Sequence, residues 1–376
     1  MSPAITETHA AGAVDEGRVV PLRADPTLST TWISWLRVVA IAGVVIIHTN
    51  GATAVAPGAR SSAEGIIAII LYRGFNFAVP AFVMVSGALL LDPAKYRGDA
   101  TFLKKRAARL VPAIVFWHLF YWGLRVTLLH QHVSARTAFI NTLNGRLFTA
   151  LYFFWIVFGL ALVSPFLIAW LRTATRRAAL IAGGSAVLIP VLTAATVKLR
   201  GAPLAWVETP WTWWIPYLGL YILGWALRGV RLRAWSTAAS VLLAVSILAF
   251  IAYNFGRDDS PSWFRPWFDG YYSLGSQGSA ILIFLAFQSL IRPGGALGLL
   301  AQGAGTRYAR IIGDCTLGIF ALHLAVLYVS YELPLLAGDA AAQTLRELFG
   351  RTAFVLLATT AIVLVARRVP VLKRLF

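Results

Sequence analysis

An arginine and a histidine stand eleven residues apart near the start of the chain, with Arg37 before an apolar run and His48 after it. In a helix, eleven residues at 100° each return to within about 20° of the starting direction, so both side chains lie on one face, about 16 Å apart along the axis. Histidine titrates near neutral pH and is a natural general base for a hydroxyl. A buried arginine needs carbonyls, water, a carboxylate or an anionic ligand.

The fifteen Asp and Glu residues fall in tails, loops or the extreme ends of apolar stretches, so we expect Arg37 to lack a carboxylate partner inside the membrane. Asp314 is expected near the start of a helix, where a carboxylate complements the helix dipole without a catalytic role. The alternative for the pair is that Arg37 snorkels to the inner headgroups while His48 caps the helix at the outer interface.

The composition requires lipid as the solvent of this chain. Of 376 residues, 59% are hydrophobic and only 13% charged, and the mean hydropathy is +0.72. The net charge of +18 does not indicate nucleic acid, because the basic residues form short blocks between apolar stretches. The single cysteine, Cys315, excludes an internal disulfide framework, and no zinc-type spacing stands out among the six histidines, so no metal is expected.

The apolar runs predict an all-α polytopic membrane protein of about ten transmembrane helices. The sixth run contains Pro216 and four aromatic or polar residues before it, so it could also be an interfacial or broken segment. The ten runs lie near residues 32–50, 66–91, 110–129, 148–171, 178–198, 211–228, 235–255, 271–291, 311–333 and 352–368.

The basic residues predict which side of the membrane each loop occupies. With a cytoplasmic N-terminus, 21 Lys and Arg residues fall on the cytoplasmic side and 9 on the other. This bias predicts a multi-pass protein of the cell membrane with both termini in the cytoplasm. Residues 1–28 lack the apolar core of a secretory signal, so we expect a flexible cytoplasmic tail there and a second cytoplasmic tail at residues 371–376.

Several motifs, in order and spacing, resemble the acyltransferase-3 family of integral membrane acyltransferases. The first is the arginine-x10-histidine signature formed by Arg37 and His48, and the second is the segment Phe77 to Leu90, similar to the family's "VPLFFMISGYLL". The third is the basic run Phe102 to Pro112, similar to "FLKKRxxRLxxP", and weaker echoes include Gly318 to His323. Two departures are Ser34, where many members have Asp, and Tyr152, where they often have Trp. The resemblance covers residues 29–370 and looks closest to the surface-polysaccharide O-acetyltransferase branch.

The resemblance implies acetyl-CoA, or another acyl-CoA, as donor and a hydroxyl of a glycan or glycolipid as acceptor. It implies that His48 assists acyl transfer and that Arg37 holds the donor or stabilises charge on the thioester oxygen. Four basic residues could bind the CoA phosphates, although positive-inside topology and anionic membrane lipids alone would also place a basic cluster there. These four are Lys104, Lys105, Arg106 and Arg109.

Four further residues are weaker candidates for the substrate pocket. Ser86 would offer a hydroxyl, although small residues in membrane helices more often allow close packing. His323 is a plausible second pocket group, whereas His118 is interpreted as a packing histidine. Arg73 could line an acceptor entrance or snorkel, and Glu208 between tryptophans could contact a sugar.

Two other functions remain open from the sequence. One is a secondary transporter or glycolipid flippase that uses Arg37 and His48 for substrate or proton coupling. The other is a non-catalytic partner of glycan-assembly proteins. Two features disfavour the transporter: the chain has no convincing internal repeat and no acidic residue deep in its apolar runs.

Overall fold

The computed structural model describes residues 30–201, 209–334, 336 and 338–376. Within these residues the chain is helical and has no strand, which confirms the expected all-α class. The helices are α1 (Thr31–Val55), α2 (Ala63–Gly74), α3 (Ala78–Leu90), α4 (Asp99–Thr127), α5 (Ala135–Leu143), α6 (Tyr152–Leu171), α7 (Arg176–Leu199), α8 (Leu218–Leu227), α9 (Ala234–Asn254), α10 (Phe264–Phe268), α11 (Leu274–Leu290), α12 (Gly303–Glu332) and α13 (Leu345–Ala366).

Each of the ten expected apolar runs overlaps a helical segment. In the described part of the chain, eight segments are long and apolar enough to cross a membrane, and two more are shorter apolar helices, Ile215–Leu227 and Leu274–Leu290. The first of these short helices is the sixth expected run, which is therefore the broken segment that Pro216 suggested. The second run, Ala63–Leu90, is interrupted between α2 and α3 by residues 75–77.

The outward faces of the long helices carry large apolar side chains. Leu242 on α9 is 69% exposed and Leu357 on α13 is 72% exposed. In water such faces would be costly, whereas in a bilayer they meet lipid tails and the backbone polar groups are satisfied inside each helix. The chain is a multi-pass membrane protein.

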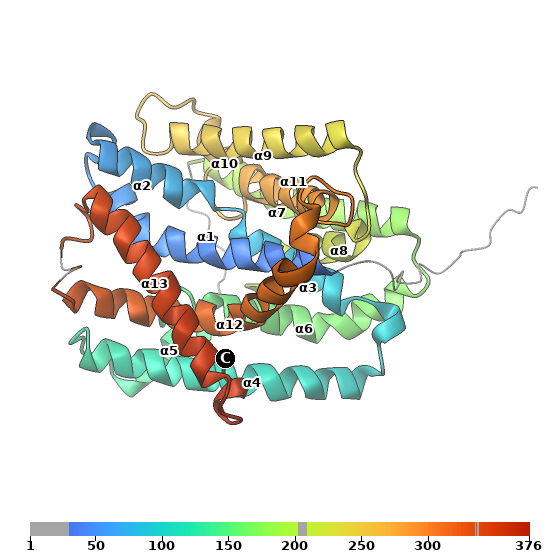
Figure 1. Ribbon diagram of the computed structural model, residues 1–376, viewed down its shortest axis with the longest axis horizontal. Helices are drawn as coiled ribbons and strands as arrows, with labels where there is room; N and C mark the ends of the chain where they lie inside the picture. The colour runs from blue at the N-terminus through green and yellow to red at the C-terminus, as the bar shows by residue number, and fades with distance from the viewer. Residues whose placement is uncertain (1–29, 202–208, 335, 337) are drawn as a thin grey trace, which may run out of the picture.

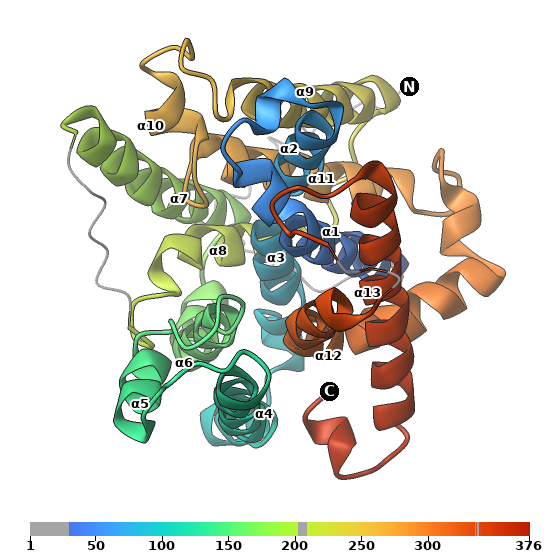
Figure 2. The same cartoon turned by 90° about the vertical axis from the view of Figure 1, so that its left-hand side faces the viewer.

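Helix α1 lies in the middle of the bundle (Figures 1 and 2), in contact with α2, α3, α11, α12 and α13. Helix α1 runs parallel to α12: their contacts follow the same order along both helices. Ser34 lies against Gly313, Arg37 against Thr316, and His48 against His323. The signature helix is thus surrounded by protein, and α12 supplies the side chains that face its polar residues.

Two glycines bring α3 and α8 into close contact. A Cβ on Gly87 of α3 would overlap the backbone carbonyl of Tyr221, and a Cβ on Gly224 of α8 would overlap the carbonyl of Met84. Only glycine permits this approach of two helix backbones. The packing fixes the end of α3 that carries Ser86.

The last residues of the chain, 371–376, fold back against α4 and α12. The indole Nε1 of Trp117 donates a hydrogen bond to the Leu375 carbonyl oxygen (3.0 Å), and the rings of Trp117 and Phe376 lie 5.2 Å apart, edge to face. This segment, which we expected to form a tail, is packed on the bundle near the basic end of α4.

Candidate active site

A cavity of about 330 Å³ opens among α1, α3, α4, α6 and α12, and three arginines line it: Arg37, Arg106 and Arg109. Apolar residues of α3, α6 and α12 form most of the remaining wall, together with Ser86 and Thr316. A cavity with several guanidinium groups on one side and apolar walls on the other suits an amphipathic anion.

Arg37 is held inside the bundle by two residues of α12. Its Nη2 donates a hydrogen bond to the Thr316 hydroxyl (2.8 Å), and its Nη1 lies 3.7 Å from Oδ1 of Asp314. The expectation that Arg37 lacks a carboxylate partner was therefore wrong. The expected place of Asp314 at a helix start was also wrong, because α12 begins at Gly303 and the carboxylate lies three turns into it.

The four basic residues of α4 divide into two groups. Arg106 and Arg109 line the cavity, whereas Lys104 and Lys105 are exposed and line neither this cavity nor its entrance among the described residues. The Arg106 guanidinium also lies 5.4 Å from the ring of Phe102. Residues 106 and 109 are three apart and lie on one face of α4, as do residues 105 and 109, so the division follows from the packing of the neighbouring helices and not from periodicity alone.

His48 and His323 form a pair deeper in the bundle. Their ring centroids lie 5.1 Å apart, with an angle of 46° between the planes. Nδ1 of His323 lies 2.7 Å from the carbonyl oxygen of Phe320, and because a carbonyl only accepts, this nitrogen carries a proton. Nε2 of His323 is buried and has no hydrogen-bond partner in the described part of the chain. The pair therefore leaves at least one ring nitrogen free to accept a proton.

A chain of three phenylalanine rings runs from the cavity wall to the histidine pair. Phe82, Phe153 and Phe320 line the cavity, with ring centroids 6.0 Å apart for the first two and 4.6 Å for the last two. The Phe320 ring in turn lies 5.9 Å from the His323 ring. The arginine end and the histidine end are thus separated by an aromatic layer.

The remaining pocket candidates lie in different places. Ser86 lines the cavity and its hydroxyl donates to the Phe82 carbonyl oxygen (2.9 Å). Arg73 lies apart from it, where its Nη2 bonds Oδ1 of Asp269 (3.0 Å) and its guanidinium stacks on Phe255 at 3.7 Å. Glu208 lies outside the described residues.

Sequence reasoning missed Thr316 and the phenylalanines as members of the site. A signal for Thr316 was present, because it precedes His323 by seven residues, two turns of one helix face. The phenylalanines gave no such signal, since aromatic residues are common in apolar helices. Among the described residues, no three His, Cys, Asp or Glu side chains lie close enough to hold a metal ion.

The arrangement can bind an anion at one end and accept a proton at the other, with apolar walls between.

Comparison with known proteins identifies a family. A family model described as an acyltransferase domain, of the acyltransferase-3 type, matches residues 30–368. No curated protein and no solved structure is similar enough to extend this comparison.

Proposed function

The chain belongs to the acyltransferase-3 family of membrane acyltransferases, and on that premise we propose that it transfers an acyl group from acyl-CoA to a hydroxyl of a glycan or glycolipid. We propose the surface-polysaccharide O-acetyltransferase branch, action in the cell membrane, and both termini in the cytoplasm. The observation that carries the proposal is the order of three features along α1 and α12: an arginine-lined cavity, an aromatic layer, and a pair formed by the buried His323 and the partly exposed His48.

The arginine end suits the phosphates of the donor. Arg106 and Arg109 face Arg37 across one cavity, and guanidinium groups bind phosphate oxygens through paired, charge-assisted hydrogen bonds. Asp314 offsets part of the charge of Arg37 and Thr316 orients it. The apolar walls beyond the arginines favour the uncharged arm of the donor over water.

The histidine end suits the transfer step. His48 takes the proton of the acceptor hydroxyl while the oxygen attacks the thioester carbonyl. The tetrahedral intermediate then collapses, the carbon–sulfur bond breaks, and the CoA thiolate leaves and takes up a proton. The products are an ester of the acceptor and CoA. His323, held by its hydrogen bond to the Phe320 carbonyl, packs against the His48 ring and would help to position it.

The spacing of the two ends favours one of the two roles considered for Arg37. An oxyanion donor must lie about 2.7–3.1 Å from the reacting oxygen. Along α1 the two residues are separated by about 16 Å, and Arg37 is bonded to α12 at Thr316, on the arginine side of Phe320. The donor-holding role is therefore favoured.

A purified-protein assay tests the proposal. The full chain in neutral detergent is mixed with radiolabelled acetyl-CoA and a panel of glycans and glycolipids, and both CoA release and label transfer are measured. We expect acceptor-dependent CoA release in the wild type and its loss in His48→Ala protein of unchanged expression and melting temperature.

Failure of the wild type to bind acetyl-CoA or release CoA with every acceptor would overturn the proposal. In that case, uptake of a labelled glycolipid into vesicles that depends on Arg37 and His48 would favour the transporter or flippase instead.

A further inference from the structure

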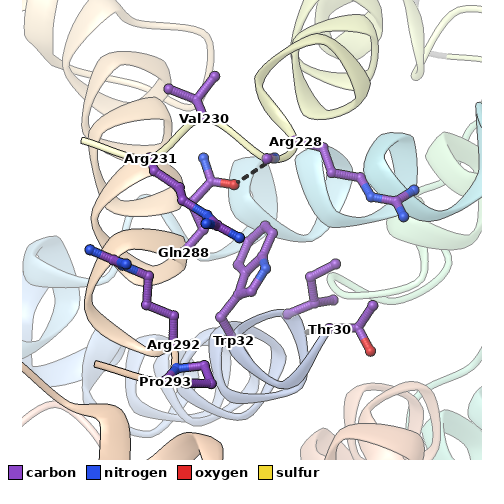
Figure 3. A pocket seen from close by; sticks show the side chains of 10 residues that line it. Thr30, Trp32, Arg228, Val230, Arg231, Gln288, Arg292 and Pro293 are labelled. Atoms are coloured by element: carbon purple, nitrogen blue, oxygen red, sulfur yellow. Dashed lines mark hydrogen bonds between the residues drawn. The ribbon is translucent and has the colours of Figure 1, made fainter. Parts of the chain in front are cut away.

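A second basic cavity lies at the end of the bundle where α1 begins, between that helix, the α8–α9 connection and the end of α11 (Figure 3). Its volume is about 240 Å³, and among the described residues it shares no lining residue with the arginine-lined cavity. Arg228, Arg231 and Arg292 line it, with Trp32 and Gln288. We propose that this cavity binds a phosphate group, carried either by an anionic phospholipid headgroup or by a soluble phosphate compound.

The walls of this cavity are fixed by hydrogen bonds to α11. The turn after α8 contains Gly229 at φ 84°, a conformation that favours glycine, and its N–H donates to Oε1 of Gln288 (3.1 Å). Nε2 of Gln288 donates to the Leu227 carbonyl oxygen (3.0 Å), and the N–H of Leu232 donates to the hydroxyl of Ser289 (3.1 Å). The turn is thus anchored on both sides, and the cavity exists before a ligand binds, which reduces the ordering cost of binding.

The three arginines differ in how their charge is balanced. Nη1 of Arg228 donates to the Ala88 carbonyl oxygen (2.9 Å) and lies 3.4 Å from Asp92 Oδ2, and Figure 3 shows this side chain pointing away from the other two. Neither Arg231 nor Arg292 forms an ion pair with a carboxylate of the described residues. Nε of Arg292 donates to the Ser289 carbonyl oxygen (3.1 Å), which orients its remaining N–H groups. Two guanidinium groups therefore remain available to an anion.

The cavity lies at the first turn of α1, at the end of the bundle that the basic residues predict to face the cytoplasmic headgroups. Trp32 is only 6% exposed and packs edge to face on Phe284 at 4.9 Å, so it forms a fixed wall, and the positive end of the α1 dipole lies at the same end. Basic pockets between transmembrane helices on the side rich in Lys and Arg accept the phosphates of anionic lipids. A soluble phosphate compound presents the same oxygens to the same guanidinium groups.

Binding to the full chain in dodecyl maltoside distinguishes these ligands. Palmitoyl-oleoyl phosphatidylglycerol is titrated and its retention followed by native mass spectrometry, and inorganic pyrophosphate is titrated by calorimetry. We expect the double variant Arg231→Gln/Arg292→Gln to bind at least about ten-fold more weakly than the wild type, because charge-assisted hydrogen bonds are lost. The matched control is Arg233→Gln/Arg307→Gln, which removes the same charge from two exposed arginines outside the cavity.

Each result has one meaning. Loss of phosphatidylglycerol in the double variant, with retention in the control, supports the site and identifies a lipid ligand. The same pattern with pyrophosphate alone supports the site and identifies a soluble ligand. Equal weakening in both variants, or no binding of either probe to the wild type, overturns the proposal.

A second variant guards against misfolding of the first. Arg231→Lys/Arg292→Lys keeps the charge but not the planar fork of donors, and we expect its affinity to lie between that of the wild type and that of the glutamine variant. Affinity no better than that of the glutamine variant in a folded protein would contradict recognition by charge. His48→Ala should bind both probes as the wild type does, because His48 lies outside this cavity. The phosphate site is therefore tested separately from acyl transfer.

Discussion

At the scale of single residues, the buried His323 and the partly exposed His48 come from helices at opposite ends of the chain and meet within the bundle. His48 belongs to α1 and His323 to α12, and the carbonyl of Phe320 fixes which nitrogen of His323 carries its proton. A general base is most useful where its orientation is held before the substrate arrives. The pair places His323 beside His48, and under the proposed mechanism we expect His323 to act as a positioning residue.

Substitution of the histidines should separate these roles. We expect His48→Ala to lower kcat by about 10²- to 10⁴-fold, the usual contribution of a general base, and His323→Ala to lower it by less. His118→Ala is the matched control, because His118 is also buried and its Nδ1 contacts the carbonyl oxygen of Ile114 (2.7 Å), but it lies beside Trp155 and not beside His48. Initial rates of CoA release and melting temperatures check all three. A loss in His118→Ala equal to that in His323→Ala would show that only packing is affected.

Two neighbouring cations on α4 test the cavity itself. Arg106 lines it, whereas Lys105 is exposed. We expect Arg106→Gln to raise KM for acyl-CoA by roughly ten-fold, since a hydrogen bond to a charged group contributes about 1.5–3 kcal/mol, while Lys105→Gln stays near the wild-type value. KM and kcat measured with acyl-CoA as the varied substrate give the comparison. Equal increases in KM would mean that surface charge, not the cavity, attracts the donor.

At the scale of helices, the sequence predicted most of the elements but not the contacts between them. Apolar runs located all ten segments, of which eight are long enough to cross a membrane and two are shorter apolar helices. It placed Asp314 wrongly, since the polar first two turns of α12, from Gly303 to Arg310, extend the helix without adding apolar residues. The meeting of Arg37 with Thr316, and of His48 with His323, depends on α1 packing parallel to α12. No local pattern encodes that contact. The resemblance named Arg37 and His48, but their contacts with Thr316 and His323 are known only from the structure.

The contact between α3 and α8 gives a prediction about stability. Gly87→Ala would place a Cβ into the Tyr221 carbonyl, and overpacking of a close contact costs about 1–3 kcal/mol. We expect a clear fall in the melting temperature of the purified protein, measured by intrinsic fluorescence. Gly123→Ala on α4 is the control, because a Cβ there meets no described atom within 4 Å and alanine favours the helix. A melting temperature of Gly87→Ala at or above that of Gly123→Ala would contradict the packing argument.

At the scale of the whole molecule, the arginine-lined cavity and the second basic cavity lie at one end of the bundle, and the proposed donor reaches the protein only if that end faces the cytoplasm. The excess of basic residues at this end supports that orientation. An arginine end facing outward would separate the donor site from the compartment that holds acyl-CoA. The orientation is therefore a condition of the proposed function.

Cysteine labelling measures this orientation directly. Replacing the buried Cys315 by serine removes the single cysteine of the chain, and one cysteine is then introduced either at Arg177, exposed in the first turn of α7, or at His132, exposed between α4 and α5. We expect a membrane-impermeant maleimide to label the His132→Cys protein in intact cells, because its loop carries few of the basic residues. The Arg177→Cys protein should react only after permeabilisation, because the start of α7 belongs to the basic side. The reverse pattern would place the arginine-lined cavity outside the cell, and a cytoplasmic acyl-CoA could then no longer be its ligand.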